Sequence, residues 1–325
     1  MTNESRYLME HFPVRKSRKQ KTAFLDWAAA ALKTAGYTPK VEEAKSTRSR
    51  NLILGNPDTA SVIFTAHYDT PARLPYPNFI VPQSMLLTLV AQAPLLILMF
   101  AVIFGIEGLI LHFVDSPLAG LLSTYVMLFG VFYLMLAGPA NPRNVNDNTS
   151  GVVTILEAAL SLPPELRSST AFILFDHEEL GLLGSSAFYK SHKKKVSNTL
   201  LINFDCVSEG DHVRFFPGKG LKKRPELLQA LEAAFSPIES KTVAVANHGY
   251  YPSDQKHFPL GVGVAVLRKG FLGLCLGRIH TGRDVIFQPE NIELLRTGCL
   301  SLAGALAPKD TVSDSSSHIE TKQEL

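Results

Sequence analysis

Carboxylate and imidazole side chains follow apolar runs at separate points of this sequence of 325 residues. The run SVIFTA leads into the HYD motif at 67–69, LLINF leads into Asp205, and AFILF leads into the DHEE segment at 176–179. Ionisable groups as crowded as those of the DHEE segment repel one another unless a positive charge lies among them, and a metal ion supplies one. The pattern therefore predicts metal-assisted chemistry, although an acidic segment of this kind also suits an ordinary helix start.

Within the HYD motif, His67 and Asp69 are two residues apart, so their side chains point to the same side of an extended chain. Asp69 can then accept a hydrogen bond from the ring nitrogen of His67 that faces away from a metal, which fixes the tautomer. The HxD spacing alone is more often structural or incidental. In the DHEE segment, adjacent glutamates point in different directions, so one can ligate an ion while the other acts as a general base.

Two further candidate ligands are Asp147 in NVNDNTSG and His280 in GLCLGRIHTGRD. Asp147 precedes a helical pattern, where Asp, Asn and Ser are also common as helix caps. Nitrogen and carboxylate donors without thiolates suit catalytic zinc, and manganese or cobalt would suit the same donors. The set can hold two ions if one carboxylate bridges them. The candidate metal ligands are His67, Asp147, Glu179, Asp205 and His280.

The elements that must position these residues alternate along the chain. Short apolar, β-rich runs predict strands at 61–66, 171–175, 200–204, 242–246 and 262–267. Apolar residues at helical spacing predict helices at 22–35, 151–162, 180–191, 225–235 and 290–307. This alternation predicts an α/β fold with a mixed, mostly parallel central sheet and helices on both faces. Open sheets of this kind form their clefts at the carboxyl ends of the strands, so we expect the candidate ligands to converge there.

Two uncharged apolar stretches, at 85–104 and 118–138, break this pattern, and each approaches the length that crosses a hydrocarbon core. Their connector contains Glu107, His112 and Asp115 but no Lys or Arg, whereas both outer flanks are basic. By the positive-inside rule, the connector lies outside and the rest of the chain faces the cytoplasm. The sequence therefore predicts a membrane-associated protein. A helical hairpin buried in the protein core, or an apolar dimer surface, is the alternative.

The domain organisation follows from these stretches. Residues 1–82 and 139–308 form one catalytic domain, and 83–138 form an inserted hydrophobic hairpin that is expected to contact the lipid bilayer through 85–138. Residues 309–325 are polar and Ser-rich and are predicted to be a disordered tail. The N-terminus has no apolar segment of the kind that a secretory signal requires.

Charge and cysteine content exclude some classes of function. The formal net charge is only +3 and the basic residues are spread out, so we expect no nucleic-acid partner. The basic run at 15–21 is predicted to be a solvated loop or helix face. The cysteines lie in apolar stretches without CxxC spacing and are expected to be reduced core residues. The oligomeric state does not follow from the sequence.

Several motifs together resemble the M28 family of metallopeptidases: AHYDT, NDNTSG, DHEELGLLGS, NFD, SDQKHF and IHTGRD. The resemblance covers nearly the whole chain outside the hydrophobic stretches and the tail. It implies a zinc-dependent peptidase, with an aminopeptidase acting on short peptides as the expected activity. The alternatives are another amide hydrolase, such as a deacylase, and a binding protein that has lost catalysis.

The resemblance also implies roles for the ligands. It makes Asp147 the bridge between two zinc ions, with Glu179 and His280 completing one site and His67 and Asp205 completing the other.

The resemblance assigns three further roles. Asp69 orients the HYD histidine, and Glu178 is the general base that takes a proton from the attacking water. Tyr250 matches a position that can donate a hydrogen bond to the oxyanion, although the adjacent Tyr251 could do the same or both could be packed against the loop.

The sequence departs from the family pattern at two places. Asn148 follows Asp147, where the family usually has a second acidic residue, so a charge is missing but no ligand is lost. The hydrophobic hairpin lies between the HYD motif and Asp147, where a short loop is normally expected. The hairpin is therefore expected to stand beside the mouth of the active site, to anchor the enzyme, and to restrict access to short peptides or to substrates at the membrane surface.

Overall fold

The computed structural model describes residues 1–238 and 240–308, so the predicted disordered tail at 309–325 lies outside the described residues. A central sheet has the strand order β1-β2-β4-β3-β5-β8-β6-β7, with β9 paired to β8. The strands are β1 (Lys40–Glu43), β2 (Arg50–Leu54), β3 (Val62–His67), β4 (Thr170–Phe175), β5 (Leu200–Phe204), β6 (His212–Pro217), β7 (Thr242–Val245), β8 (Gly261–Gly270) and β9 (Gly273–Cys275). The predicted α/β fold with a mixed sheet is confirmed.

The middle of the sheet is parallel and its flanks are antiparallel. Strand β3 pairs in parallel with β4 and β5, and β5 pairs in parallel with β8. Strands β2 and β6 add to this core in the antiparallel direction. Every residue of β3, β4 and β5 is buried, as the continuous apolar sequences of central parallel strands require. The carboxyl ends of β3, β4 and β5 therefore lie at one edge of the sheet.

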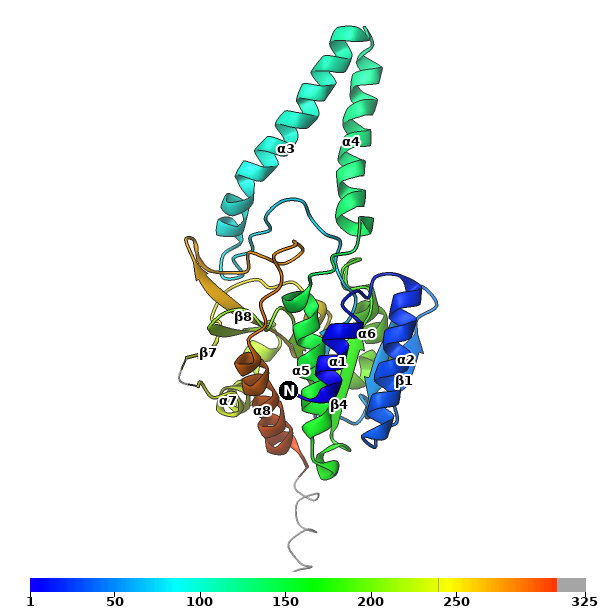
Figure 1. Cartoon of the computed structure of the whole chain (residues 1–325). Coiled ribbons are helices and arrows are strands. Elements are labelled where there is room, and N and C mark those ends of the chain that lie inside the picture. The colour runs from blue at the N-terminus through cyan, green and yellow to red at the C-terminus, as the bar shows by residue number, and fades with distance from the viewer. Residues whose placement is uncertain (239, 309–325) are drawn as a thin grey trace, which may run out of the picture.

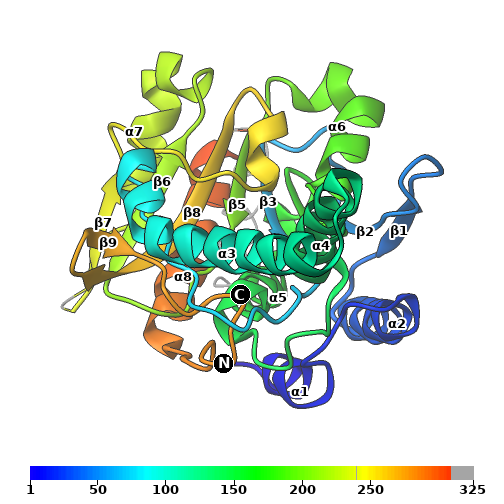
Figure 2. The ribbon, with the colours of Figure 1, turned by 90° about the horizontal axis from the view of Figure 1, so that it is seen from above.

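Helices cover both faces of this sheet (Figure 2). Helices α5 and α8 pack against each other and against β3, and the alternate residues Val62, Phe64 and Ala66 face that side. On the other face, Ile63 joins a cluster with Phe188 of α6. The helices of the domain are α1 (Asn3–His11), α2 (Arg18–Thr34), α5 (Ser150–Ser161), α6 (Leu183–Val196), α7 (Pro225–Ala234) and α8 (Pro289–Leu306).

The predicted strands and helices are all present, with ends shifted by a few residues. Helix α1 and strand β6 are among the elements that the sequence patterns miss. Helix α1 is mostly polar and buries only Ser5 and Leu8, so it carries little hydrophobic periodicity. In β6, the sequence HVRFFP places charged and apolar residues in a short run that is too irregular to indicate a strand. The cysteines Cys206, Cys275 and Cys299 are buried and free, as predicted.

The hydrophobic stretches form a hairpin that projects away from the sheet (Figure 1). Helix α3 (Met85–Phe113) continues past the predicted end of the first stretch, so Glu107 lies inside the helix and only 114–116 connect it to α4 (Pro117–Ala137). The most apolar window has a mean hydropathy of 2.5 in α3 and 1.9 in α4. Only 6% of each window is buried. The alternative that the hairpin is buried in the domain core is therefore wrong. By length and composition both helices could cross a membrane.

Candidate metal centre

The candidate ligands come together at the carboxyl edge of the central strands. His67 is the last residue of β3, Asp205 directly follows β5, and Glu179 lies in the loop after β4. Asp147 lies in the wide turn η1 (Val145–Thr149) before α5, and His280 lies in the loop between β9 and α8. Ligands that are far apart in sequence are thus collected because parallel strands end at the same edge.

Asp147 lies between the two histidines. Its Oδ1 is 3.4 Å from Nε2 of His67, and its Oδ2 is 3.0 Å from Nε2 of His280. Asp205 Oδ1 lies 3.8 Å from Nε2 of His67, and Glu179 Oε2 lies 3.6 Å from Nε2 of His280. The five donors therefore fall into two groups that share one carboxylate.

The polar atoms of this cluster fit a metal ion better than they fit one another. Nε2 of His67 and Oε1 of Glu179 are buried and have no hydrogen-bond partner among the described residues. His67, Asp147 and Glu179 each offer a donor atom within 4.8 Å of the others, and so do His67, Glu178 and Asp205. Buried polar atoms without partners are costly, and a cation coordinated by them removes that cost. The imidazole and carboxylate donors are those of catalytic zinc sites.

Cys206 also lies beside the cluster, and its Sγ is a further possible donor together with Asp147 and Asp205. Its Sγ is 3.1 Å from Oδ1 of Asp205, to which the thiol can donate. Burial, with the charges of Asp147 and Asp205, raises the pKa of the Cys206 thiol well above its usual value. Without a cation the thiol therefore stays protonated, and a bound metal would favour the thiolate.

The electrostatics of the cluster favour a cation. Burial raises the pKa of Glu179 to about 8, and burial together with neighbouring carboxylates raises that of Glu178 well above its usual range. Burial opposes protonation of His280, but Glu179 and Asp147 outweigh it and raise its pKa to about 9. The carboxylates thus crowd enough negative charge together to hold protons, and a divalent cation can replace those protons.

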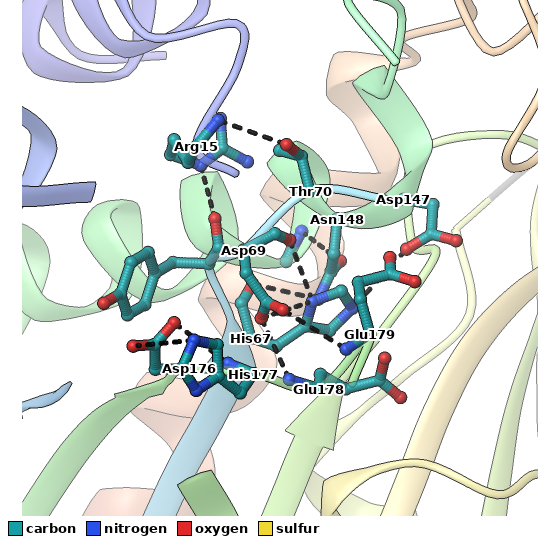
Figure 3. Close-up of polar contacts among 12 residues, drawn as sticks. Arg15, His67, Asp69, Thr70, Asp147, Asn148, Asp176, His177, Glu178 and Glu179 are labelled. Atoms are coloured by element: carbon teal, nitrogen blue, oxygen red, sulfur yellow. Dashed lines mark hydrogen bonds and ion pairs between the residues drawn. The ribbon is translucent and has the colours of Figure 1, made fainter. Parts of the chain in front are cut away.

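Asp69 connects the HYD motif to the two glutamates (Figure 3). Its Oδ1 accepts a hydrogen bond from the backbone N–H of Glu178 at 3.0 Å, and its Oδ2 accepts one from that of Glu179 at 3.2 Å. Nδ1 of His67 faces the same residue, 3.6 Å from Oδ1 and 3.2 Å from the backbone oxygen. Burial opposes ionisation of Asp69, but His67 and Lys21 outweigh it and lower its pKa to about 2. The carboxylate is therefore ionised while it holds the backbone of both glutamates.

Asp284 supports the central ligand, and the sequence patterns miss it. Its carboxylate is fully buried and accepts hydrogen bonds from the backbone N–H groups of Asn146 at 2.8 Å and Asp147 at 3.0 Å. These bonds fix the turn that presents Asp147. The only sequence signal is the position of Asp284 four residues after His280 in IHTGRD.

Asn148 acts as a cross-link between elements. Its Nδ2 donates to the carbonyl of Phe204 at the end of β5 at 2.9 Å, and its Oδ1 accepts from the N–H of Gly151 at 3.0 Å. An ionised carboxylate at this position could accept but could not donate to the carbonyl. The side chain thus has a donor role that explains why asparagine fits here.

The prediction that residues 15–21 form a solvated face is wrong for Arg15 and Lys21. Arg15 is fully buried, and its guanidinium donates to the carbonyl of Tyr68 at 2.6 Å and to the hydroxyl of Thr149 at 3.0 Å. Lys21 Nζ lies 2.5 Å from Oδ1 of the buried Asp176. Both side chains therefore tie the N-terminal segment to the loops that carry the site.

A cavity of about 300 Å³ opens onto these groups. Asp147, Glu178 and His280 line one side of it, and Met85 and Thr88 from the first turn of α3 line another. The hairpin thus contributes directly to the wall of the site.

The two tyrosines of NHGYYPSD both line this cavity but differ in their surroundings. Tyr251 is buried, and its hydroxyl donates to the backbone oxygen of Asp205 at 3.1 Å. Tyr250 is 53% exposed.

A family model described as "Peptidase family M28" matches residues 131–301, which is more than half of the chain. The match includes Asp147, Glu178, Glu179, Asp205 and His280. No curated protein matches the sequence.

Solved structures share the fold. The LapA aminopeptidase of Legionella pneumophila has a TM-score of 0.58 at 13% identity, over 94% of this chain and 70% of that chain. A Zn-dependent exopeptidase from Parabacteroides distasonis has a TM-score of 0.56 at 14% identity, over 93% of this chain and 96% of that chain. The glutaminyl cyclase of Porphyromonas gingivalis has a TM-score of 0.54 at 18% identity, over 93% of this chain and 96% of that chain. Identities this low establish a common fold and no more.

Proposed function

Because this chain belongs to peptidase family M28 and is a metal-dependent peptidase, we propose that it is a di-zinc aminopeptidase that acts on short peptides at a membrane surface. The observation that carries the proposal is the position of Asp147, whose two carboxylate oxygens face different histidines at 3.4 and 3.0 Å. One carboxylate shared in this way suits a pair of ions. His67 and Asp205 would hold one ion, and Glu179 and His280 the other.

Bound zinc would polarise the scissile carbonyl and bring the pKa of a water molecule close to neutral pH. Glu178 is the base in this proposal: its carboxylate accepts a proton from the attacking water and returns it to the leaving amine nitrogen. The buried, negatively charged surroundings that raise the pKa of Glu178 suit a group that must both take up and release a proton.

Two neighbours complete the proposed machinery. Asp69 holds the backbone of Glu178 through the N–H hydrogen bond of 3.0 Å, so it fixes where the base can point. Tyr250 is the better candidate for a donor to the oxyanion, because it lines the cavity and the hydroxyl of Tyr251 already donates to a backbone carbonyl.

Preference for a free N-terminus and for short peptides follows from zinc chemistry and from size. The unprotonated amine of a peptide N-terminus is a nitrogen donor that could fill an open position on zinc, and the cavity has only about 300 Å³. Because Met85 and Thr88 of the hairpin close one side, short peptides enter more readily than folded chains.

Membrane association is the second part of the proposal. Helices that are apolar on all sides and exposed to solvent find their favourable environment in a lipid bilayer. The absence of Lys and Arg from the connector supports a catalytic domain on the cytoplasmic side by the positive-inside rule. We expect the full chain to stay with membranes in high salt and to require detergent for release.

The test is a panel of short peptides with free and acetylated N-termini, assayed with full-length protein in detergent while bound zinc is measured. We expect two zinc ions per chain and cleavage that is lost when the amine is blocked. Cleavage of blocked peptides at internal bonds would contradict the aminopeptidase assignment. Release of fatty or acetyl groups would instead identify a deacylase, and conversion of an N-terminal glutamine to pyroglutamate would identify a cyclase.

A further inference from the structure

A second cavity, of about 420 Å³, lies outside the metal centre and is lined by arginines. Arg73, Arg268, Arg278 and Arg283 contribute to its wall, no lining residue is acidic, and none of its lining residues lines the catalytic cavity. We propose that this arginine pocket binds the phosphate of an anionic phospholipid headgroup. The inference rests on the proposed insertion of the hairpin into a bilayer but not on the peptidase assignment.

The charge of the arginine pocket is incompletely neutralised. Among the described residues, Glu209 pairs with Arg278 and lies 3.7 Å from Nε of Arg268. Arg73 and Arg283 are exposed and form no ion pair with any described residue. One carboxylate thus faces four guanidinium groups, which leaves three positive charges for a ligand. Guanidinium groups bind phosphate oxygens through paired, charge-assisted hydrogen bonds.

Two glycines, Gly277 and Gly282, lie directly against two of these guanidinium groups. A Cβ at Gly277 would come within 2.5 Å of Nη2 of Arg268, and a Cβ at Gly282 within 2.9 Å of Nη2 of Arg73. Side chains larger than hydrogen would therefore displace the guanidinium groups. The loop at 276–284 is shaped so that arginines from separate segments reach the same space.

The arginine pocket lies beside the base of the hairpin. Its wall includes Phe79, whose carbonyl accepts a hydrogen bond of 2.9 Å from Nε2 of Gln92 in α3. Figure 1 shows the segment that leads into α3 on the hairpin side of the domain. Tyr76 also lines the wall, and aromatic residues of this kind are typical of the membrane interface.

Two other basic side chains contact the last turn of α4 or the loop that lines the arginine pocket. Lys16 Nζ donates to the carbonyl of Leu136 in the last turn of α4 at 2.9 Å, and Arg143 donates to the carbonyl of Gly282 at 3.0 Å. A surface with this charge faces the headgroups of an anionic cytoplasmic leaflet favourably. A lipid phosphate is therefore the better occupant than free phosphate, because the inserted hairpin holds the pocket at the headgroup layer.

The experiment uses the full-length protein in nanodiscs of phosphatidylcholine, without and with increasing phosphatidylglycerol. Retained phosphatidylglycerol is measured by native mass spectrometry, and the thermal midpoint is measured in parallel. We expect phosphatidylglycerol to raise the midpoint of the parent. The variant Arg73→Gln/Arg283→Gln should lose this rise and retain phosphatidylglycerol about 30-fold more weakly, since each basic group contributes about a fivefold factor.

The matched control is Lys193→Gln/Lys194→Gln, which removes the same charge from the exposed end of α6 that lies away from the DHEE segment. This control should bind phosphatidylglycerol as the parent does, and Arg73→Lys/Arg283→Lys should retain most of the binding. Equal losses in the glutamine and control variants would overturn the proposal, because net charge alone would then explain the effect.

Three more outcomes bear on the proposal. An equal rise of the midpoint on adding inorganic phosphate to phosphatidylcholine nanodiscs would overturn the lipid assignment in favour of free phosphate. A higher KM of the glutamine variant for peptides with a free, but not an amidated, C-terminus would overturn it in favour of a substrate carboxylate site. Failure of the parent to enter phosphatidylcholine nanodiscs would overturn both the lipid site and the membrane part of the proposed function, while leaving the peptidase assignment untouched.

Discussion

The central strands and the hairpin are the two most apolar regions of the molecule, and they are covered in opposite ways. Every residue of β3, β4 and β5 is buried between helices of the same domain. In α3 and α4, only 6% of the most apolar window is buried. An apolar sequence therefore predicts that both regions are removed from water. It does not identify whether the same domain or another phase surrounds them.

The central strands and the hairpin therefore depend on different surroundings for their stability. The strands are stabilised by the domain itself, and they position the candidate metal ligands without help from outside. The hairpin depends on another phase or partner for its cover. Changes at the site should therefore impair catalysis and leave membrane association intact, whereas removal of the hairpin should do the reverse. The following predictions test that separation, in order of decreasing effect on catalysis.

Removal of the metal should have the largest effect. Chelation is expected to abolish peptide hydrolysis, because the carboxylates and imidazoles alone offer no strong electrophile. If zinc is present at about a thousand times its Kd, its loss costs about 4 kcal/mol of folding stability. Calorimetry should show a midpoint lower by about 10 °C, with recovery when zinc is restored. Sedimentation with membranes should not change; full activity in metal-free protein would contradict the proposed function.

Glu178→Gln should lower kcat by about 10²- to 10⁴-fold, because an amide of the same shape cannot accept the proton. Bound zinc, measured by elemental analysis, should stay at the parent level if Glu178 is a base and not a ligand. Glu165→Gln, at an exposed position before the start of β4 and so at the opposite end of that strand from the site, is the control and should have parent kinetics. A variant that loses zinc together with activity would instead make Glu178 a ligand.

Asp284→Asn should weaken zinc binding by about 10- to 100-fold, because a neutral amide cannot accept from both backbone N–H groups that fix Asp147. Leaving one of these buried groups unpaired should also cost about 1–3 kcal/mol of stability. Zinc competition titrations and urea unfolding measure the two effects. Glu43→Gln is the control, because the side chains of Glu43 and of its partner Arg18 are 45% and 62% exposed and such a surface pair contributes little. Equal effects of the two substitutions would refute the positioning role of Asp284.

Replacing 85–137 with a Gly-Ser linker should have the smallest effect on catalysis and the largest on location. The segments that flank the hairpin keep their contacts with the ligand loop, such as Leu74 N–H to the carbonyl of His280 at 2.7 Å. We expect kcat within about tenfold of the parent and a higher KM, because Met85 and Thr88 no longer line the cavity. The variant should be recovered without detergent. If it stays with membranes, the hairpin is not the anchor.

The strength of the sequence signal explains what could be predicted. The sequence indicates His67 and Asp205 because one ends a central apolar strand and the other directly follows one. The pairing of β3 with β5 then brings them together. Arg15 was misassigned because a basic residue is ordinarily solvated, and the groups that satisfy it, the carbonyl of Tyr68 and the hydroxyl of Thr149, lie far along the chain. Asp284 was missed for the same reason: its partners are backbone N–H groups, which leave no mark on the sequence.

The position of the hairpin in the chain also fixes an order of assembly. Strand β3 lies between β4 and β5 in the sheet, and both of these are translated after the hairpin. Of the five candidate ligands, only His67 has been synthesised when α3 leaves the ribosome. The catalytic sheet therefore cannot close until α3 and α4 are complete, and with the proposed membrane insertion a nascent chain would meet the bilayer before its site has formed. Activity would begin only where the finished protein resides.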